Sequence, residues 1–152
     1  MKIDRQLLMT GIPLIDKQHK EYADLVDRFF ELAMGGHVTR QDLSRETDAV
    51  FKYAMEHFDT EEYIMRIQHY PAYAEHRAKH NVFRKRTDTL TLDSEGDIDL
   101  DGYTITLSKW LIEWFCDQVQ TDDKKLAVFL NNKTAHGQAP DQTEGSDGKP
   151  SP

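Results

Sequence analysis

Three histidines and a carboxylate stand in two short stretches of the chain at spacings that suit metal coordination. His57 and Glu61 lie four residues apart, and so do His76 and His80. At about 3.6 residues per turn, each pair places both side chains on one face of a helix, one turn apart. Imidazole is a good ligand for first-row transition metals, and carboxylates offset buried positive charge. The two stretches therefore predict half of a metal site held by helices.

Four helical segments position these residues. In each segment apolar residues recur at steps of three and four, the period of an amphipathic helix. The first begins after Pro13 and ends at Gly35-Gly36, and the second begins at the N-cap Thr39. The third carries the second histidine pair, and the fourth, from about residue 103 to 132, is the most apolar. We expect an all-α, up-down-up-down four-helix bundle with the metal site in its core.

The composition of the chain sets the domain organisation. Its 152 residues suit one domain, which we place at 14–133 after an N-terminal arm at 1–13. Residues 93–102 are acidic and contain glycine, which predicts a loop. Residues 134–152 have almost nothing to bury, which predicts a disordered C-terminal tail.

Charge and cysteine content exclude several classes of partner and site. The net charge of -8 disfavours binding to nucleic acid or to an anionic membrane surface. Cys116 is the only cysteine, so any metal must depend on histidines and carboxylates, and no base stands beside this thiol to activate it. No apolar stretch approaches a membrane span or a signal core. We therefore expect a cytoplasmic protein, and a monomer.

Three motifs resemble those of the hemerythrin family, in its bacterial, bacteriohemerythrin-like branch. They are Gln18-His19-Lys20, His-Phe-x-x-Glu-Glu at 57–62, and Tyr70-Pro71 ahead of the His-x-x-x-His at 76–80. The resemblance extends from about residue 11 to residue 130. It implies a four-helix bundle that holds two irons with five histidines, a bridging Glu and a bridging Asp, and that binds dioxygen reversibly.

The resemblance also implies roles for particular residues. His19 and His57 would hold the iron that keeps an open position for dioxygen, while His76, His80 and a fifth histidine would hold the other iron. An apolar wall around the dioxygen site would exclude water and slow the loss of bound oxygen as superoxide. That wall is implied to consist of Tyr22, Phe58, Trp114, Phe115 and Val119.

The fourth helix departs from the family pattern. The resemblance implies that Glu61 and Asp123 bridge the two irons (Fe2+/Fe3+), and it then sets Gln118 where the fifth histidine belongs. A register one residue earlier pairs Asp117 with Asp122, but Gln118 and Asp123 better share the buried face. The amide either binds iron weakly, leaves its place to a water, or leaves a second open position. Our hypothesis is that the diiron centre assembles but oxidises more readily or reacts with small molecules at both irons.

Other candidate sites fail on chemical grounds. The acidic stretch 97–102 matches the first half of an EF-hand loop, but Ser108 stands where the bidentate Glu belongs. Between the third-helix histidines, Arg77 occupies the place of the general base of a zinc protease. The remaining histidines are expected at the surface: His37, His69 and His136.

These patterns favour a binding protein over an enzyme. The first hypothesis is a non-haem diiron protein with dioxygen as its ligand, serving oxygen storage, delivery or protection. The alternative is an oxygen or redox sensor whose diiron state is read by a protein partner, and a fragment of a longer signalling protein would favour it. A third hypothesis, a diiron oxidase or peroxidase, depends on the extra open position that Gln118 would create.

Overall fold

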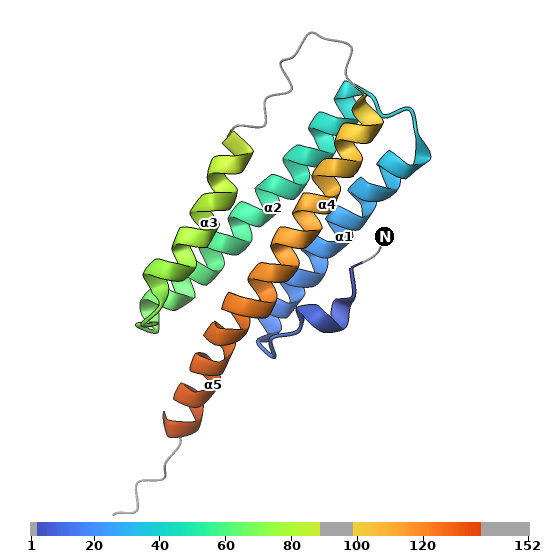
Figure 1. Ribbon diagram of the computed structural model, residues 1–152. Coiled ribbons are helices and arrows are strands. Elements are labelled where there is room, and N and C mark those ends of the chain that lie inside the picture. The colour runs from blue at the N-terminus through green and yellow to red at the C-terminus, as the bar shows by residue number, and fades with distance from the viewer. Residues whose placement is uncertain (1–2, 89–98, 138–152) are drawn as a thin grey trace, which may run out of the picture.

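Four long helices lie side by side and alternate in direction in the computed structural model, which describes residues 3–88 and 99–137 (Figure 1). They are α1 (Pro13–Gly35), α2 (Arg40–Ile67), α3 (Tyr73–Asp88) and α4 (Leu100–Gln118). No strand occurs in this described part of the chain. The predicted all-α, up-down-up-down four-helix bundle is confirmed.

The last helix is longer than predicted and is not a plain α-helix. It begins at Leu100 because the Asp99 side chain accepts the Gly102 N–H at 2.9 Å, and a Cβ at position 102 would collide with that carboxylate. After α4 the backbone forms a π-helical segment, η2 (Val119–Asp123), and continues as α5 (Lys124–Gly137). Residues 100–102 therefore belong to the helix rather than to the predicted loop. Positions 89–98, which include the rest of that loop, and 138–152, which hold most of the predicted tail, lie outside the described residues.

Local contacts fix where α1 and α2 begin and end. Before α1, the Asp16 carboxylate accepts the backbone N–H of Thr10 at 2.7 Å, which anchors the incoming chain. Gly36 ends α1 with φ at 73°, a left-handed conformation that glycine adopts without steric cost. Thr39 and Asp42 then form a reciprocal capping box that starts α2. Both the predicted glycine stop and the predicted N-cap are confirmed.

The N-terminal arm packs against the bundle as a short 3₁₀-helix, η1 (Arg5–Leu8). Arg5 pairs with Asp27 of α1 at 2.8 Å, and the same carboxylate accepts the Ile3 N–H at 3.1 Å. Leu8 is buried at 2% exposure. The arm is thereby held in place against α1.

Two apolar clusters occupy the bundle interior, one on each side of a polar layer. The larger cluster includes Tyr22, Phe58 and Phe115, and the smaller consists of Ile15, Met65 and Leu126. The polar layer lies between the two clusters. On α1, for example, His19 follows Ile15 by one turn and precedes Tyr22 by one turn. Water is excluded from the layer on both sides. No helix of the described residues has the length and apolar content that crossing a membrane requires.

Candidate metal centre

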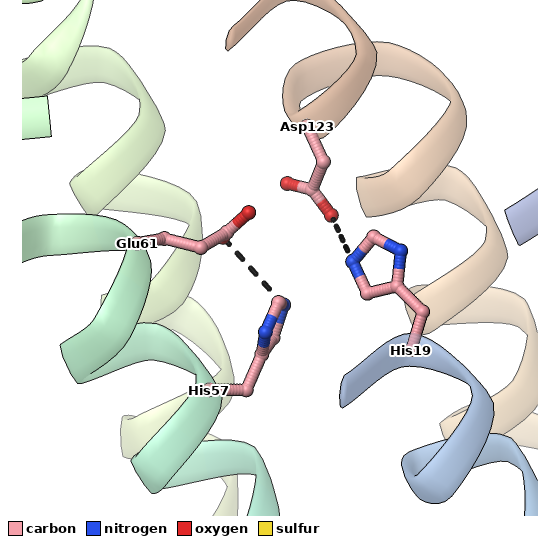
Figure 2. Close-up of side chains that lie close together, drawn as sticks. All are labelled: His19, His57, Glu61 and Asp123. Carbon is pink, nitrogen blue, oxygen red and sulfur yellow. Dashed lines mark ion pairs between the residues drawn. The ribbon is translucent and has the colours of Figure 1, made fainter. Parts of the chain in front are cut away.

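The helices bring the predicted ligands into one buried cluster. α1 supplies one histidine, α2 and α3 supply two residues each, and η2 supplies a carboxylate. Figure 2 shows His19, His57, Glu61 and Asp123 pointing toward one another from three of these elements. The cluster residues are all at most 1% exposed: His19, His57, Glu61, His76, His80 and Asp123. His57 and Asp123, which are 66 residues apart in the sequence, thus share one site.

Within this cluster, two groups of ligand atoms are each compact enough to surround one ion. In each group the available nitrogen and oxygen atoms all lie within 4.8 Å of one another. The first position is defined by His19, His57, Glu61 and Asp123. The second position is defined by Glu61, His76 and His80. One carboxylate belongs to both groups.

Glu61 lies between the two positions. Its Oε2 atom is 3.6 Å from His57 Nε2 of the first position. The same oxygen is 3.2 Å from His76 Nε2 and 3.3 Å from His80 Nε2 of the second position. A carboxylate approached by histidines from both sides is placed to bridge two cations.

Asp123 spans the cluster in a similar way, with one oxygen toward each side. Its Oδ2 atom is 3.2 Å from His19 Nε2, and its Oδ1 atom is 3.1 Å from His76 Nε2. The side chain thus connects the first position to a histidine of the second. This arrangement suits the bridging role that the sequence predicts for Asp123.

The donor set fits a pair of cations. Two ligands about 2.1 Å from a common first-row ion are about 3 Å apart when they bind at right angles, close to the 3.1–3.6 Å found here. In the described chain, the inward Nε2 atoms of all four histidines and both Glu61 oxygens are buried without a hydrogen-bond partner. Buried polar groups normally have partners, and two buried carboxylates need positive charge nearby. Metal cations satisfy both requirements.

The protonation behaviour of the cluster reflects its burial and its two carboxylates. Burial lowers the pKa of His57 to about 4, because its charged form is cut off from water. Burial acts on His76 in the same direction, but Asp123 and Glu61 beside Nε2 outweigh it and raise its pKa to about 10. For Glu61, burial is opposed by His57, His76 and His80, which together hold its pKa well below the usual range. The site therefore favours the ionised form of Glu61 and attracts positive charge.

Outer contacts orient three of the four histidines, and the sequence analysis missed them. His19 Nδ1 lies 2.8 Å from the Leu8 carbonyl oxygen, so the N-terminal arm fixes this ring. His57 Nδ1 lies 3.2 Å from Gln18 Oε1, and His80 Nδ1 lies 3.1 Å from Glu62 Oε1. Such contacts set which nitrogen faces a metal. Gln18 and Glu62 each stand next to a predicted ligand in the sequence motifs, and this position could have identified them. Nothing in the sequence indicates the Leu8 carbonyl.

The π-helical segment explains how Gln118 and Asp123 reach the same side of the helix. The Lys124 N–H donates to the Val119 carbonyl, five residues back, so each turn here holds more residues than in an α-helix. Residues five apart then lie nearly above one another. Gln118 is 2% exposed, and its Nε2 donates to Asp123 Oδ1 at 3.2 Å.

The competing register is disfavoured by the contacts of its residues. Asp122 forms an ion pair with Lys79 and accepts the Thr121 hydroxyl, and neither contact belongs to the cluster. Asp117 is 69% exposed. Asp123, by contrast, lies against His19 and His76, and Gln118 is buried beside it.

Aromatic side chains cover the cluster on the side of the larger apolar cluster. Phe58 stacks on His80 with ring centroids 4.1 Å apart, and Phe115 meets His19 edge-on at 5.4 Å. Tyr22 packs 4.2 Å from Phe115, and its buried hydroxyl has no partner among the described residues, so burial raises its pKa. Trp114 is only partly buried and contacts Phe58 at 5.5 Å. The fifth predicted wall residue, Val119, is fully buried at the start of η2.

The remaining histidines and the cysteine stand apart from the cluster. His37 and His69 lie in the connections at the ends of α1 and α2, both with positive φ, and are exposed. Cys116 is a partly buried free thiol on α4. The side chain of His136 lies outside the described residues.

Comparison with known proteins gives the cluster a family. The family model described as "Hemerythrin HHE cation binding domain" matches residues 10–130, a range that holds every residue of the cluster. This chain belongs to the hemerythrin family. The cation binding in that description agrees with a donor set of four histidines and two carboxylates that this hemerythrin buries in its core.

Several relatives of this hemerythrin are named bacteriohemerythrin. The one from Stenotrophomonas maltophilia is 30% identical over 126 residues, covering 79% of this chain and 75% of the relative. The one from Methylococcus capsulatus is 32% identical over 72 residues, covering 47% and 53%. The one from Pseudomonas aeruginosa is 25% identical over 117 residues, covering 76% and 72%. No solved structure matches the chain.

Proposed function

We propose that this hemerythrin is a non-haem diiron protein that binds dioxygen reversibly, for storage, delivery or protection. The observation that supports this proposal most is the place of Glu61 between the two positions. Its Oε2 atom is within 3.6 Å of histidines from both. Such a shared carboxylate suits two ions rather than one. The bacteriohemerythrin relatives support the same proposal.

The chain's own residues would divide the work of such a site. His19 and His57 would hold one iron, and His76 and His80 the other, with the two carboxylates between them offsetting the buried charge. An iron pair held there would supply the electrons that reversible binding of dioxygen requires. The apolar wall described above excludes water, so a bound ligand meets no ready source of protons from solvent.

One experiment tests this function directly. Iron per chain is measured in the reduced protein, and the optical spectrum is followed from anaerobic to aerobic solution and back. We expect two irons per chain and an absorption band that appears with oxygen and disappears on its removal. One iron per chain, or a spectrum that does not reverse, contradicts the proposal.

A second measurement separates binding from catalysis. The loaded protein is mixed with hydrogen peroxide and a reducing cosubstrate, and peroxide consumption is followed over time. A binding protein consumes no more than a few equivalents of peroxide per chain. Sustained turnover would instead support the oxidase or peroxidase alternative.

A further inference from the structure

With Asp123 between the positions, each is held by two histidines and two shared carboxylates, so the second position lacks the third histidine that the family resemblance implies. Four residues offer ligand atoms to the first position, whereas Glu61, His76 and His80 are the three that form the second group. Asp123 adds its Oδ1 near His76, at 3.1 Å. Two other polar side chains are buried next to Asp123, but Asp122 is paired with Lys79, whereas Gln118 bonds to Asp123 itself. The completeness of the second position therefore depends on Gln118.

The amide of Gln118 is engaged with Asp123. Its Nε2 donates to Asp123 Oδ1 at 3.2 Å. Because the amide nitrogen is directed at this carboxylate oxygen, the amide oxygen, Oε1, is directed away from it. An amide oxygen is also a weaker ligand for iron than imidazole. Gln118 therefore acts on the site through Asp123, as a positioning residue.

From these contacts we propose that Gln118 is not a metal ligand and that the second position binds a small exogenous ligand. This inference rests on the proposed diiron function. Gln118 Oε1 is buried and has no hydrogen-bond partner among the described residues. A water or hydroxide at the second position would donate to this oxygen, as buried acceptors require. Gln118 is only 2% exposed, so the ligand binds inside the bundle, and small molecules such as nitric oxide or azide are the probes of choice.

Glu62 explains how the second position can hold a metal with two imidazoles where the family pattern has three. Its carboxylate accepts from His80 Nδ1 at 3.1 Å and is itself held by Arg84 at 2.8 Å. A carboxylate behind a ligating histidine makes that imidazole a stronger donor. At the first position the matching acceptors are neutral, namely the Leu8 carbonyl and the Gln18 amide. The stronger donor offsets the missing one.

Counting bound nitric oxide tests the inference. The reduced protein is titrated anaerobically with nitric oxide after its iron content is measured, and the oxidised protein is titrated with azide. We expect two nitric oxide molecules per iron pair in the natural chain and in Gln118→Ala. Gln118→His supplies the missing imidazole and should reduce the count to one.

The outcomes separate this inference from the proposed function. Two irons, a reversible oxygen band and one nitric oxide per pair in the natural chain overturn the inference and leave the proposed function standing. A count that rises from one to two in Gln118→Ala shows instead that the amide oxygen is a ligand. Absence of the iron pair overturns both proposals. Because the natural chain alone distinguishes one ligand from two, the test survives if a variant fails to fold.

Discussion

The two metal positions are built in different ways. The histidines of the first position come from α1 and α2, and their outer partners are a carbonyl of the N-terminal arm and the Gln18 amide. The histidines of the second position stand one turn apart on α3, and the acidic Glu62 supports one of them. The first position thus depends on how separate segments pack, whereas the second is set largely within one helix. Variants that affect one position and spare the other can test this difference.

The largest effect is expected at the residue that the positions share. Glu61→Ala removes the oxygen that lies within 3.6 Å of histidines on both sides, so both irons should be lost. Iron per chain, measured on folded protein, should fall from two to nearly none. Asp59→Ala, in the same motif but exposed, is the matched control and should keep both. Retention of both irons in Glu61→Ala would show that this carboxylate is no bridge.

A smaller effect should distinguish the outer partners of the two positions. Glu62→Gln replaces the charged acceptor at His80 Nδ1 with a neutral one, and loss of such a partner typically weakens metal affinity by about 10–100-fold. Gln18→Ala removes a neutral partner of His57 and should weaken the first position less. Competition with a chelator measures both affinities. Equal losses in the two variants would remove the proposed difference between the positions.

Adding a histidine to the second position should slow oxidation of the iron pair. Gln118→His adds an imidazole and removes the place where water or another small ligand enters, so autoxidation of the oxygenated protein should slow several-fold. The decay of the oxygen-dependent absorption band in air gives the rate. Gln118→Ala, which adds no donor, serves as the control. Identical rates in the natural chain and Gln118→His would contradict the expectation.

The smallest effect concerns bundle stability away from both positions. Asp101, more than four turns before Gln118 on α4, accepts the backbone N–H groups of Val38 at 2.8 Å and His37 at 3.0 Å, and these bonds lower its pKa. A lowered folded-state pKa adds stability above the unfolded pKa and loses it as pH falls through the folded value. The difference in thermal midpoint between the natural chain and Asp101→Asn should therefore shrink below about pH 4.

The exposed Asp48 provides the control for that measurement, because Asp48→Asn should leave the acid dependence unchanged. Iron content should be the same in both variants near neutral pH. A difference between Asp101→Asn and the natural chain that persists at low pH would mean that the ionised carboxylate is not the source of the stability.

Local geometry explains which parts of the site the sequence could predict. His57 with Glu61, and His76 with His80, face the same way because helix periodicity fixes residues four apart. The stop at Gly36 and the cap at Thr39 likewise depend on neighbours within four residues. These features follow from short-range rules, so they needed no knowledge of packing.

What the sequence did not predict comes from backbone irregularities, from one cap and from a contact between separate segments. The π-helical turn at Val119–Asp123, which brings Asp123 rather than Asp122 into the cluster, has no pattern in the residues themselves. The Leu8 carbonyl meets His19 because the arm folds back on α1. The early start of α4 depends on Asp99 as its N-cap, and this role was not recognised because the surrounding residues are also acidic.

By itself the sequence determined the helical bundle, the family resemblance and the histidines and Glu61 that it sets at helical spacings. Only the tertiary structure decided how these groups meet: Glu61 between both positions, Asp123 spanning them, and the Gln118 amide turned toward Asp123. The reason is physical. Spacing along a helix fixes the face that a side chain occupies, but packing between helices fixes which atoms of different segments lie within a metal's reach.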